Sequence, residues 1–185
     1  MTTGQPVRWS RAGDPEEIVF VPRRTDHPDA AALLDAFFQE QVGRYGFAES
    51  VDLDPDIYDE PNGLFVVVYQ DDRPVGCGGC RRFEQRGDTF EIKKTYLIPE
   101  ARGCGLGRQL LDMLEDAAVG WGARRTILET GVRNVAALRL FTSNGYVPIA
   151  RYVASRDPEI NRAFEKDLTG SSHRLTPDGV QQATV

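Results

Sequence analysis

The segment Ile98–Leu111, "IPEARGCGLGRQLL", constrains the fold more than any other part of this 185-residue chain. It follows a strand-like run, contains Gly103, Gly105 and Gly107, and leads into the strongest helical pattern of the chain. Glycines at such a junction let backbone N–H groups converge without Cβ atoms in the way, and the N-terminus of a helix adds about +0.5 elementary charge. The junction therefore predicts a binding site for an anion.

The spacing of the glycines excludes two well-known phosphate-binding loops. A G-x-G-x-x-G dinucleotide loop would need a third glycine where the chain has Arg108, and a P-loop would need a lysine followed by serine or threonine. Arg102 and Arg108 instead flank the loop and supply positive charge for a diphosphate. A glycine-rich turn that binds no ligand is the alternative on this loop alone.

Strand and helix patterns alternate along the chain, without an internal repeat. Apolar patterning predicts strands over 18–24, 64–70, 74–84, 89–98 and 124–131, and helices over 26–43, 105–122 and from Asn134 to Gly145. Turns at 71–74 and 87–88 make the three strands from 64 to 98 an antiparallel meander. Strand-like segments at 146–153 and 162–168 close a single domain, which we expect to span 18–168 between a flexible segment 1–17 and a disordered tail 169–185.

Charge and cysteine content exclude several classes of protein. The 22 Lys and Arg against 28 Asp and Glu give a net charge of -6, which argues against a nucleic-acid partner held by phosphate contacts. No run approaches the ~20 apolar residues of a membrane span, and the N-terminus lacks the apolar centre of a secretory signal, so we expect a cytoplasmic protein without a membrane partner. Cys77 and Cys80 form one C-x-x-C pair whose odd spacing puts the two thiols on opposite faces of a strand, so no metal is expected.

The order of these motifs resembles the GNAT superfamily of N-acetyltransferases. In that family the pyrophosphate loop reads Gln or Arg, two residues, Gly, one residue, Gly or Ala, which matches Arg102, Gly105 and Gly107. The resemblance extends upstream through "EIKKTYLIPEARG" and downstream through "LETGVRNVAALRLFTSNGY", and it covers about Phe65 to Tyr152. It implies an α/β GNAT-like acyl-CoA N-acyltransferase fold, with a mixed, mostly antiparallel sheet of six or seven strands and helices on both faces.

The resemblance implies acetyl-CoA as the co-substrate. Its pantetheine arm would pair with the strand backbone in a gap between the fourth and fifth predicted strands, and its diphosphate would lie on the loop amides. A backbone N–H at Leu97 or Ile98 would stabilise the oxyanion of the reaction. The implied cofactor-binding residues are Tyr96, Leu97, Ile98, Arg102, Gly103, Cys104, Gly105, Leu106, Gly107, Arg108 and Asn134.

Glu91 is the candidate general base. It lies eleven residues before Arg102, as the glutamate base does in histone-type GNAT enzymes, and its apolar neighbours could raise its pKa by desolvation. A purely structural Glu91, paired with Lys93 or a neighbouring arginine, is the alternative. The second choice for the base is Glu129, which could equally be a structural partner of Arg124 or Arg133.

The chain departs from the family where many members carry the tyrosine that protonates the leaving thiolate, because Phe141 stands at that position. A phenyl ring cannot donate a proton. Either another hydroxyl acts as the acid, or the thiolate leaves without help. We take Tyr146 as the candidate acid, with Tyr152 and Tyr96 as alternatives.

An acidic segment completes the sequence evidence. Residues 49–60, "ESVDLDPDIYDE", contain six carboxylates and no base, which equals the whole acidic excess of 28 over 22. The segment is either a solvated loop or the entrance for a cationic acceptor. We therefore expect acetyl transfer to a primary amine of a small molecule or peptide by direct attack, with a noncatalytic acyl-CoA sensor and a nucleotide-binding module as rivals, and with monomer and homodimer both open.

Overall fold

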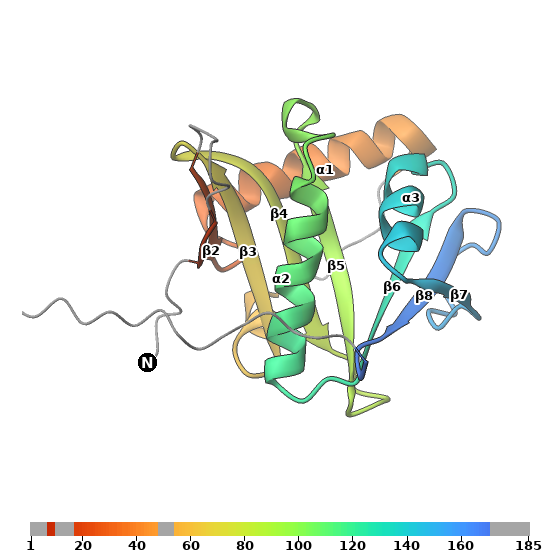
Figure 1. The fold of residues 1–185 in the computed structure, drawn as a ribbon. Helices are drawn as coiled ribbons and strands as arrows, with labels where there is room; N and C mark the ends of the chain where they lie inside the picture. Colours follow the sequence, from red (N-terminus) through yellow and green to blue (C-terminus); the bar gives the residue numbers. More distant parts are fainter. Residues whose placement is uncertain (1–6, 10–16, 48–53, 171–185) are drawn as a thin grey trace, which may run out of the picture.

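A mixed sheet of eight strands organises the chain, which we describe from a computed structural model over residues 7–9, 17–47 and 54–170. The strands are β1 (Val7–Trp9), β2 (Ile18–Pro22), β3 (Gly63–Gln70), β4 (Arg73–Arg82), β5 (Thr89–Leu97), β6 (Arg125–Gly131), β7 (Val147–Ile149) and β8 (Asn161–Asp167), in the order β1-β2-β3-β4-β5-β6-β8-β7. The helices are α1 (Pro28–Tyr45), α2 (Leu106–Gly120) and α3 (Val135–Ser143), with short 3-10 turns η1 (Pro55–Tyr58) and η2 (Pro99–Ala101) (Figure 1).

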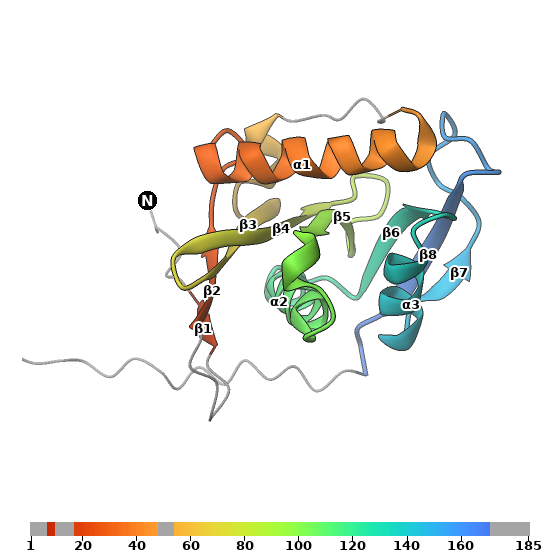
Figure 2. The ribbon, with the colours of Figure 1, turned by 90° about the horizontal axis from the view of Figure 1, so that it is seen from above.

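The helices cover both faces of the sheet, which confirms the predicted fold class. α1 lies on one face, and α2 and α3 lie on the other (Figure 2). The sheet exceeds the expected six or seven strands because β1 pairs antiparallel with β2 at the outer edge. β1 falls within the leading segment 1–17, most of which lies outside the described residues, as does the tail from residue 171.

Most neighbouring strands are antiparallel, and β5 with β6 is the parallel pair. β3 and β4 form the predicted hairpin, in which Asp71 and Asp72 take φ angles of 48° and 63°, as a two-residue type I′ turn requires. β5 pairs with β6 over Thr89–Glu91 and Arg125–Ile127 only. Beyond these residues the two strands diverge (Figure 1).

A bulge in β5 accompanies this divergence. The register with β4 shifts between the pairs Cys77–Tyr96 and Gly79–Lys93, so that β5 contains one extra residue there. Lys94, within the bulge, has a φ of 56°, which is unusual for a side chain this large. A bulge bends its strand and increases its twist, which directs the end of β5 away from β6.

The core has one layer on each side of the sheet. β3 is buried on both faces, which explains its continuous apolar run from Leu64 to Val68. Cys77 packs on the α1 side and Cys80 on the α2 side, as their odd spacing predicts. The central members of the α2 layer are Phe90, Leu110, Leu111, Leu114 and Phe164, and those of the α1 layer are Ala30, Leu33, Leu34, Phe65 and Val67.

The helix ends follow from local capping. α1 begins after His27, whose Nδ1 accepts the Asp29 N–H at 3.3 Å, so the cap is one residue later than the predicted Asp26. The helix continues past Gly43 and ends at Gly46, where φ is 81°. Asn134 caps α3 as predicted, with its Oδ1 accepting the Ala137 N–H at 3.3 Å. None of the helices in the described ranges has the length and apolar character needed to cross a bilayer.

Candidate active site

The loop between β5 and α2 is shaped by glycines. Gly103 and Gly105 have φ angles of 83° and 88°, which L side chains rarely adopt. A Cβ atom at either position would meet no heavy atom within 4 Å, so the backbone here borders open space. Gly105 caps α2 without a side-chain hydrogen bond, which leaves the N–H groups of Leu106 and Gly107, at the start of the helix, without a capping side chain. The loop is therefore suited to an anion.

A first cavity of about 330 Å³ opens over this loop, and we call it the donor cavity. It is bounded by α1, the end of β5, the start of α2 and α3. Arg102 is fixed at its edge, with its Nη2 2.5 Å from Glu40 Oε2 and its Nε donating to the Leu97 carbonyl at 2.9 Å. The predicted cofactor-binding residues that line it are Tyr96, Leu97, Arg102, Gly103, Gly105, Gly107, Arg108 and Asn134.

The other predicted cofactor-binding residues do not line the donor cavity. The Ile98 N–H donates to the Val75 carbonyl at 2.9 Å, so this amide is engaged in the sheet and Leu97 is the remaining predicted oxyanion donor. Leu106, the first residue of α2, is buried in the core. Cys104 is exposed in the loop, with its Sγ 3.3 Å from the Ala101 carbonyl oxygen.

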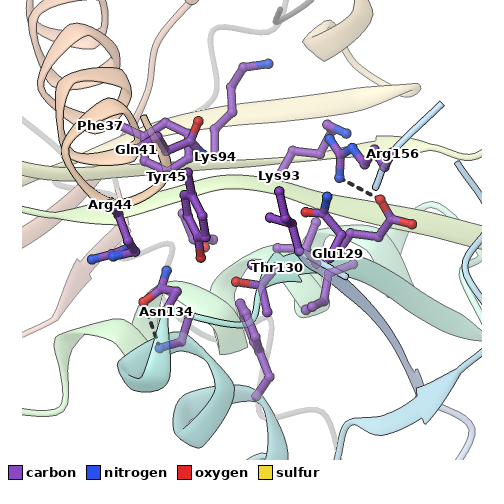
Figure 3. Close-up of a pocket in the computed structure, with 18 of the residues that line it drawn as sticks. Phe37, Gln41, Arg44, Tyr45, Lys93, Lys94, Glu129, Thr130, Asn134 and Arg156 are labelled. Atoms are coloured by element: carbon purple, nitrogen blue, oxygen red, sulfur yellow. Dashed lines mark hydrogen bonds and ion pairs between the residues drawn. The ribbon is translucent and has the colours of Figure 1, made fainter. Parts of the chain in front are cut away.

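A second cavity of about 260 Å³ adjoins the first, and we call it the acceptor cavity (Figure 3). It reaches from the end of α1 across the gap between β5 and β6 to the loop after β7. One set of residues lines both cavities: Phe37, Gln41, Arg44, Thr95, Asn134, Ala137 and Phe141. The split between β5 and β6 therefore joins two spaces that could hold two substrates.

Glu91 lies in the acceptor cavity, held by three donors. Its Oε1 accepts from Lys93 Nζ at 3.0 Å and from the Tyr152 hydroxyl at 3.0 Å, and its Oε2 accepts from Arg81 Nε at 3.0 Å. Burial by itself would raise the pKa of Glu91, but the charges of Lys93 and Arg81 outweigh it and lower the pKa. The expected rise in this pKa is therefore wrong, because desolvation is compensated by two cations.

Glu129 lies in the same cavity with one oxygen unpaired. Its side chain is only 1% exposed, and its Oε2 accepts from Arg156 Nη1 at 2.7 Å (Figure 3). Arg156, and neither Arg124 nor Arg133, is thus its ion-pair partner. Within the described residues, Oε1 is buried and has no hydrogen-bond donor. Leaving a buried polar atom unsatisfied costs about 1–3 kcal/mol, so this oxygen is a strong acceptor for a ligand donor.

The three tyrosines considered as the acid lie in different environments. The Tyr146 hydroxyl lies 2.8 Å from the Thr126 hydroxyl and donates to Glu115 Oε1 at 2.9 Å, in the core and outside the lining of both cavities. Tyr152 donates to Glu91, and burial together with Glu91 raises its pKa. Tyr96 lines the donor cavity.

Some residues of the site could not be assigned from the sequence. Arg81 faces Glu91 across the β4–β5 ladder, a pairing that an exact hairpin register would have predicted. Arg156 comes from the irregular loop between β7 and β8, where no periodic signal marks it. Its role is visible only in the structure.

The acidic segment is separate from both cavities in its described part. Asp56 and Asp59 pair with Arg24 at 2.9 and 3.0 Å, and the Asp54 side chain accepts the Asp56 N–H at the start of η1. No residue from 54 to 60 lines either cavity. Residues 49–53, with the acidic side chains of Glu49 and Asp52, lie outside the described ranges.

Comparison with known proteins assigns this geometry to a family. The sequence model of the acetyltransferase (GNAT) family matches residues 29–146. The chain belongs to the GNAT acetyltransferase family. It is 31% identical over 129 residues to an IAA acetyltransferase from Azospirillum brasilense, covering 69% of this chain and 84% of the relative. As a member, it is an acyltransferase.

Solved structures agree with the fold. An acyl-CoA N-acyltransferase structure from Klebsiella pneumoniae is 25% identical, with a TM-score of 0.70 over 82% of this chain and 97% of that one. A GNAT family acetyltransferase from Elizabethkingia anophelis with acetyl-CoA bound is 18% identical, with a TM-score of 0.59 over 82% of this chain and 98% of that one.

Proposed function

We propose that this GNAT enzyme transfers the acetyl group of acetyl-CoA to the primary amine of a small acceptor. The observation that carries the proposal is the pair of adjoining cavities at the split between β5 and β6. One cavity contains a glycine loop suited to a diphosphate, and the other contains carboxylates suited to an amine. The residues that line both cavities would surround the point where donor and acceptor meet.

The donor cavity fits acetyl-CoA through its loop and its strand. The amides of 103–107 and the exposed Arg108 side chain would hold the diphosphate, and Leu97 would offer its backbone to the pantetheine arm. The Arg108 N–H already donates to the Gly105 carbonyl at 3.1 Å. Arg102 already bridges the Leu97 carbonyl and Glu40, so it stands between the strand and α1 at this position. Bound acetyl-CoA supplies a thioester, which is an activated acyl group.

Direct attack needs a group that takes a proton from the amine. The amine nitrogen bonds to the thioester carbon, the carbon–sulfur bond breaks with its electron pair going to sulfur, and the nitrogen loses a proton to a base. Glu91 already accepts hydrogen bonds from Lys93, Tyr152 and Arg81, so at least one of them would have to be released before it could take a proton. Its lowered pKa also makes it a weaker base. Glu129 has a free oxygen in the same cavity, so we propose Glu129 as the base and Glu91 as a residue that positions Lys93 and Arg81.

The leaving thiolate needs no protein acid in this proposal. Phe141 lines both cavities and has no proton to give, and Tyr146 lies outside both. Tyr96 is the predicted acid candidate that lines the donor cavity, and burial raises its pKa. With an ordinary pKa of about 8.5, a thiolate can leave unprotonated near neutral pH.

The proposal is tested by comparing Glu129→Gln, Glu91→Gln and the control Glu165→Gln, using thiol release from acetyl-CoA with a panel of primary amines. Glu165 pairs with Arg86 and Arg125 away from both cavities. General-base loss costs about 10²–10⁴-fold in rate, so we expect Glu129→Gln to lower kcat at least a hundredfold with the KM for acetyl-CoA retained. A wild-type enzyme that binds acetyl-CoA but releases no thiol with any amine would overturn the proposed reaction.

A cytoplasmic location and the choice between monomer and homodimer stay predictions.

A further inference from the structure

Positive charge gathers around the acceptor cavity. The net charge of the whole chain is -6, so this local excess runs against the overall composition. The charged side chains that line the cavity are the cations Arg44, Arg81, Lys93, Lys94 and Arg156 and the anions Glu91 and Glu129. Arg44 pairs with Glu40 at 2.6 Å and Lys94 Nζ donates to the Tyr58 hydroxyl at 3.1 Å, so the excess lies at Arg81 and Lys93. An acceptor that is itself purely cationic would be repelled here.

The excess is greatest around Lys93. Glu91 is shared between Lys93 and Arg81, at 3.0 Å from each, so one carboxylate faces two cations. Burial is the first cause that lowers the pKa of Lys93, and the charges of Arg156 and Arg81 lower it further against the opposing effect of Glu91. Glu129 pairs with Arg156 and is therefore not an ion-pair partner of Lys93 or Arg81. A bound anion would compensate the remaining charge.

Glu129 makes the same cavity suited to a hydrogen-bond donor as well. Its buried Oε1 has no donor within the described part of the chain, although the side chain is only 1% exposed. An ammonium or amine group carries the donors that this oxygen lacks. The cavity thus combines an unsatisfied acceptor with uncompensated positive charge.

We infer that the acceptor is an amino carboxylate, whose amine binds Glu129 Oε1 and whose carboxylate binds the cations at Lys93 and Arg81. This inference rests on the proposed function and narrows it to a substrate class. The cavity volume of about 260 Å³ suits a molecule of amino-acid size, since sites for larger ligands start at about 300 Å³. It replaces the cationic acceptor considered from the acidic segment.

Matched substrates test the inference. Thiol release from acetyl-CoA is measured with a series of α-amino acids, with the primary amines that lack only the carboxylate, and with the corresponding amino acid amides. A charge-assisted hydrogen bond to the carboxylate stabilises binding enough to change kcat/KM about tenfold. We therefore expect the kcat/KM of the best amino acid to exceed that of its matched amine and of its amide at least tenfold. Amines or amides that equal or exceed every acid would overturn the inference while leaving the proposed acetyl transfer intact.

Variants then locate the preference. Lys93→Gln should reduce the ratio of kcat/KM between acid and matched amine about tenfold through the KM of the acid, and Lys93→Arg should retain the ratio. Arg81→Gln is the second variant, in case Lys93→Gln fails to fold. Arg86→Gln is the matched control, because Arg86 is 57% exposed and pairs with Glu165 outside both cavities while the change in net charge is the same. An unchanged ratio in both Lys93→Gln and Arg81→Gln, or an equal fall in Arg86→Gln, would overturn the assignment.

Discussion

At the scale of single residues, Phe141 decides how the leaving group can be handled. Phe141 is 3% exposed and lines both cavities, and its ring centroid lies 5.7 Å from that of Tyr146. The position is therefore near the meeting point of donor and acceptor but offers only a hydrocarbon surface. The enzyme must release the thiolate unassisted or take a proton from elsewhere.

Phe141→Tyr restores a hydroxyl at this position. We expect kcat with an amine to stay the same or rise, because a phenol at the junction of the cavities could protonate the sulfur. The added oxygen should lower the free energy of unfolding by no more than about 1–3 kcal/mol, the range typical of overpacking. Steady-state kinetics and the Tm of both proteins check this. A fall in kcat with an unchanged KM for acetyl-CoA would show that the pocket is too tightly packed for the hydroxyl.

The cysteines give a second residue-scale prediction. Burial raises the pKa of Cys77 and of Cys80 to about 12, whereas Cys104 is exposed in the anion loop. A chromogenic thiol reagent should therefore label one of the three cysteines in the native enzyme, and saturating acetyl-CoA should slow the labelling. Cys104→Ser should abolish the fast reaction. Labelling of more than one thiol in the native enzyme would contradict the burial of Cys77 and Cys80.

At the scale of elements, the junction of β5 and α2 creates the donor cavity. The bulge at Lys94 turns the end of β5 away from β6, and Gly105 then starts α2 with its amides directed at the space that opens. The proposed anion site thus depends on one irregular strand and on one helix whose N-cap, Gly105, has no side chain. Neither element would form the site alone.

Arg108→Glu tests this element without disturbing packing. Arg108 is 69% exposed in the first turn of α2, with Asp112 at 3.7 Å. We expect the KM for acetyl-CoA to rise at least tenfold with little change in Tm, because the reversed charge repels the diphosphate. Arg86→Glu is the control for net charge, because Arg86 lines neither cavity. Equal KM values in both variants would remove the loop from donor binding.

At the scale of the whole molecule, the Glu91 cluster joins distant parts of the chain. Arg81 belongs to β4, Lys93 to β5 and Tyr152 to the loop after β7, and all contact one carboxylate that is 2% exposed. The cluster thus ties the two halves of the split sheet together next to the acceptor cavity. Its charge state should influence global stability.

Glu91→Gln should lower the free energy of unfolding at pH 7 by about 3 kcal/mol, the lower end for breaking a buried ion pair. Because the pKa of Glu91 is lowered in the folded state, its stabilisation is complete above the ordinary value of about 4.3 and is lost as the pH falls through the folded value. The deficit of the variant should therefore shrink as the pH falls from 5 to 3, measured by urea unfolding. A deficit that stays constant over this range would contradict the ionic role of Glu91.

The elements of this fold were largely predictable, because they depend on local patterning. The apolar run of β3, the stripe of α2 and the Asn134 cap are each set by side chains within a few residues. β1 and the late end of α1 were missed, since a three-residue edge strand has no periodicity and Gly43 is followed by residues that continue the helix. Helix ends depend on caps that compete over several positions.

The sequence alone determined the family, the glycine loop and the pair of candidate carboxylates, because each depends on residue type and spacing along the chain. Only the tertiary structure decided which side chains surround those carboxylates. Arg81 and Tyr152 reach Glu91 from other elements, and Arg156 reaches one oxygen of Glu129 and leaves the other free. Neighbours in space set the pKa of a carboxylate and decide whether its oxygens have donors. These neighbours can be as far apart in the chain as Tyr152 and Glu91, which are 61 residues apart, so residue spacing does not reveal them.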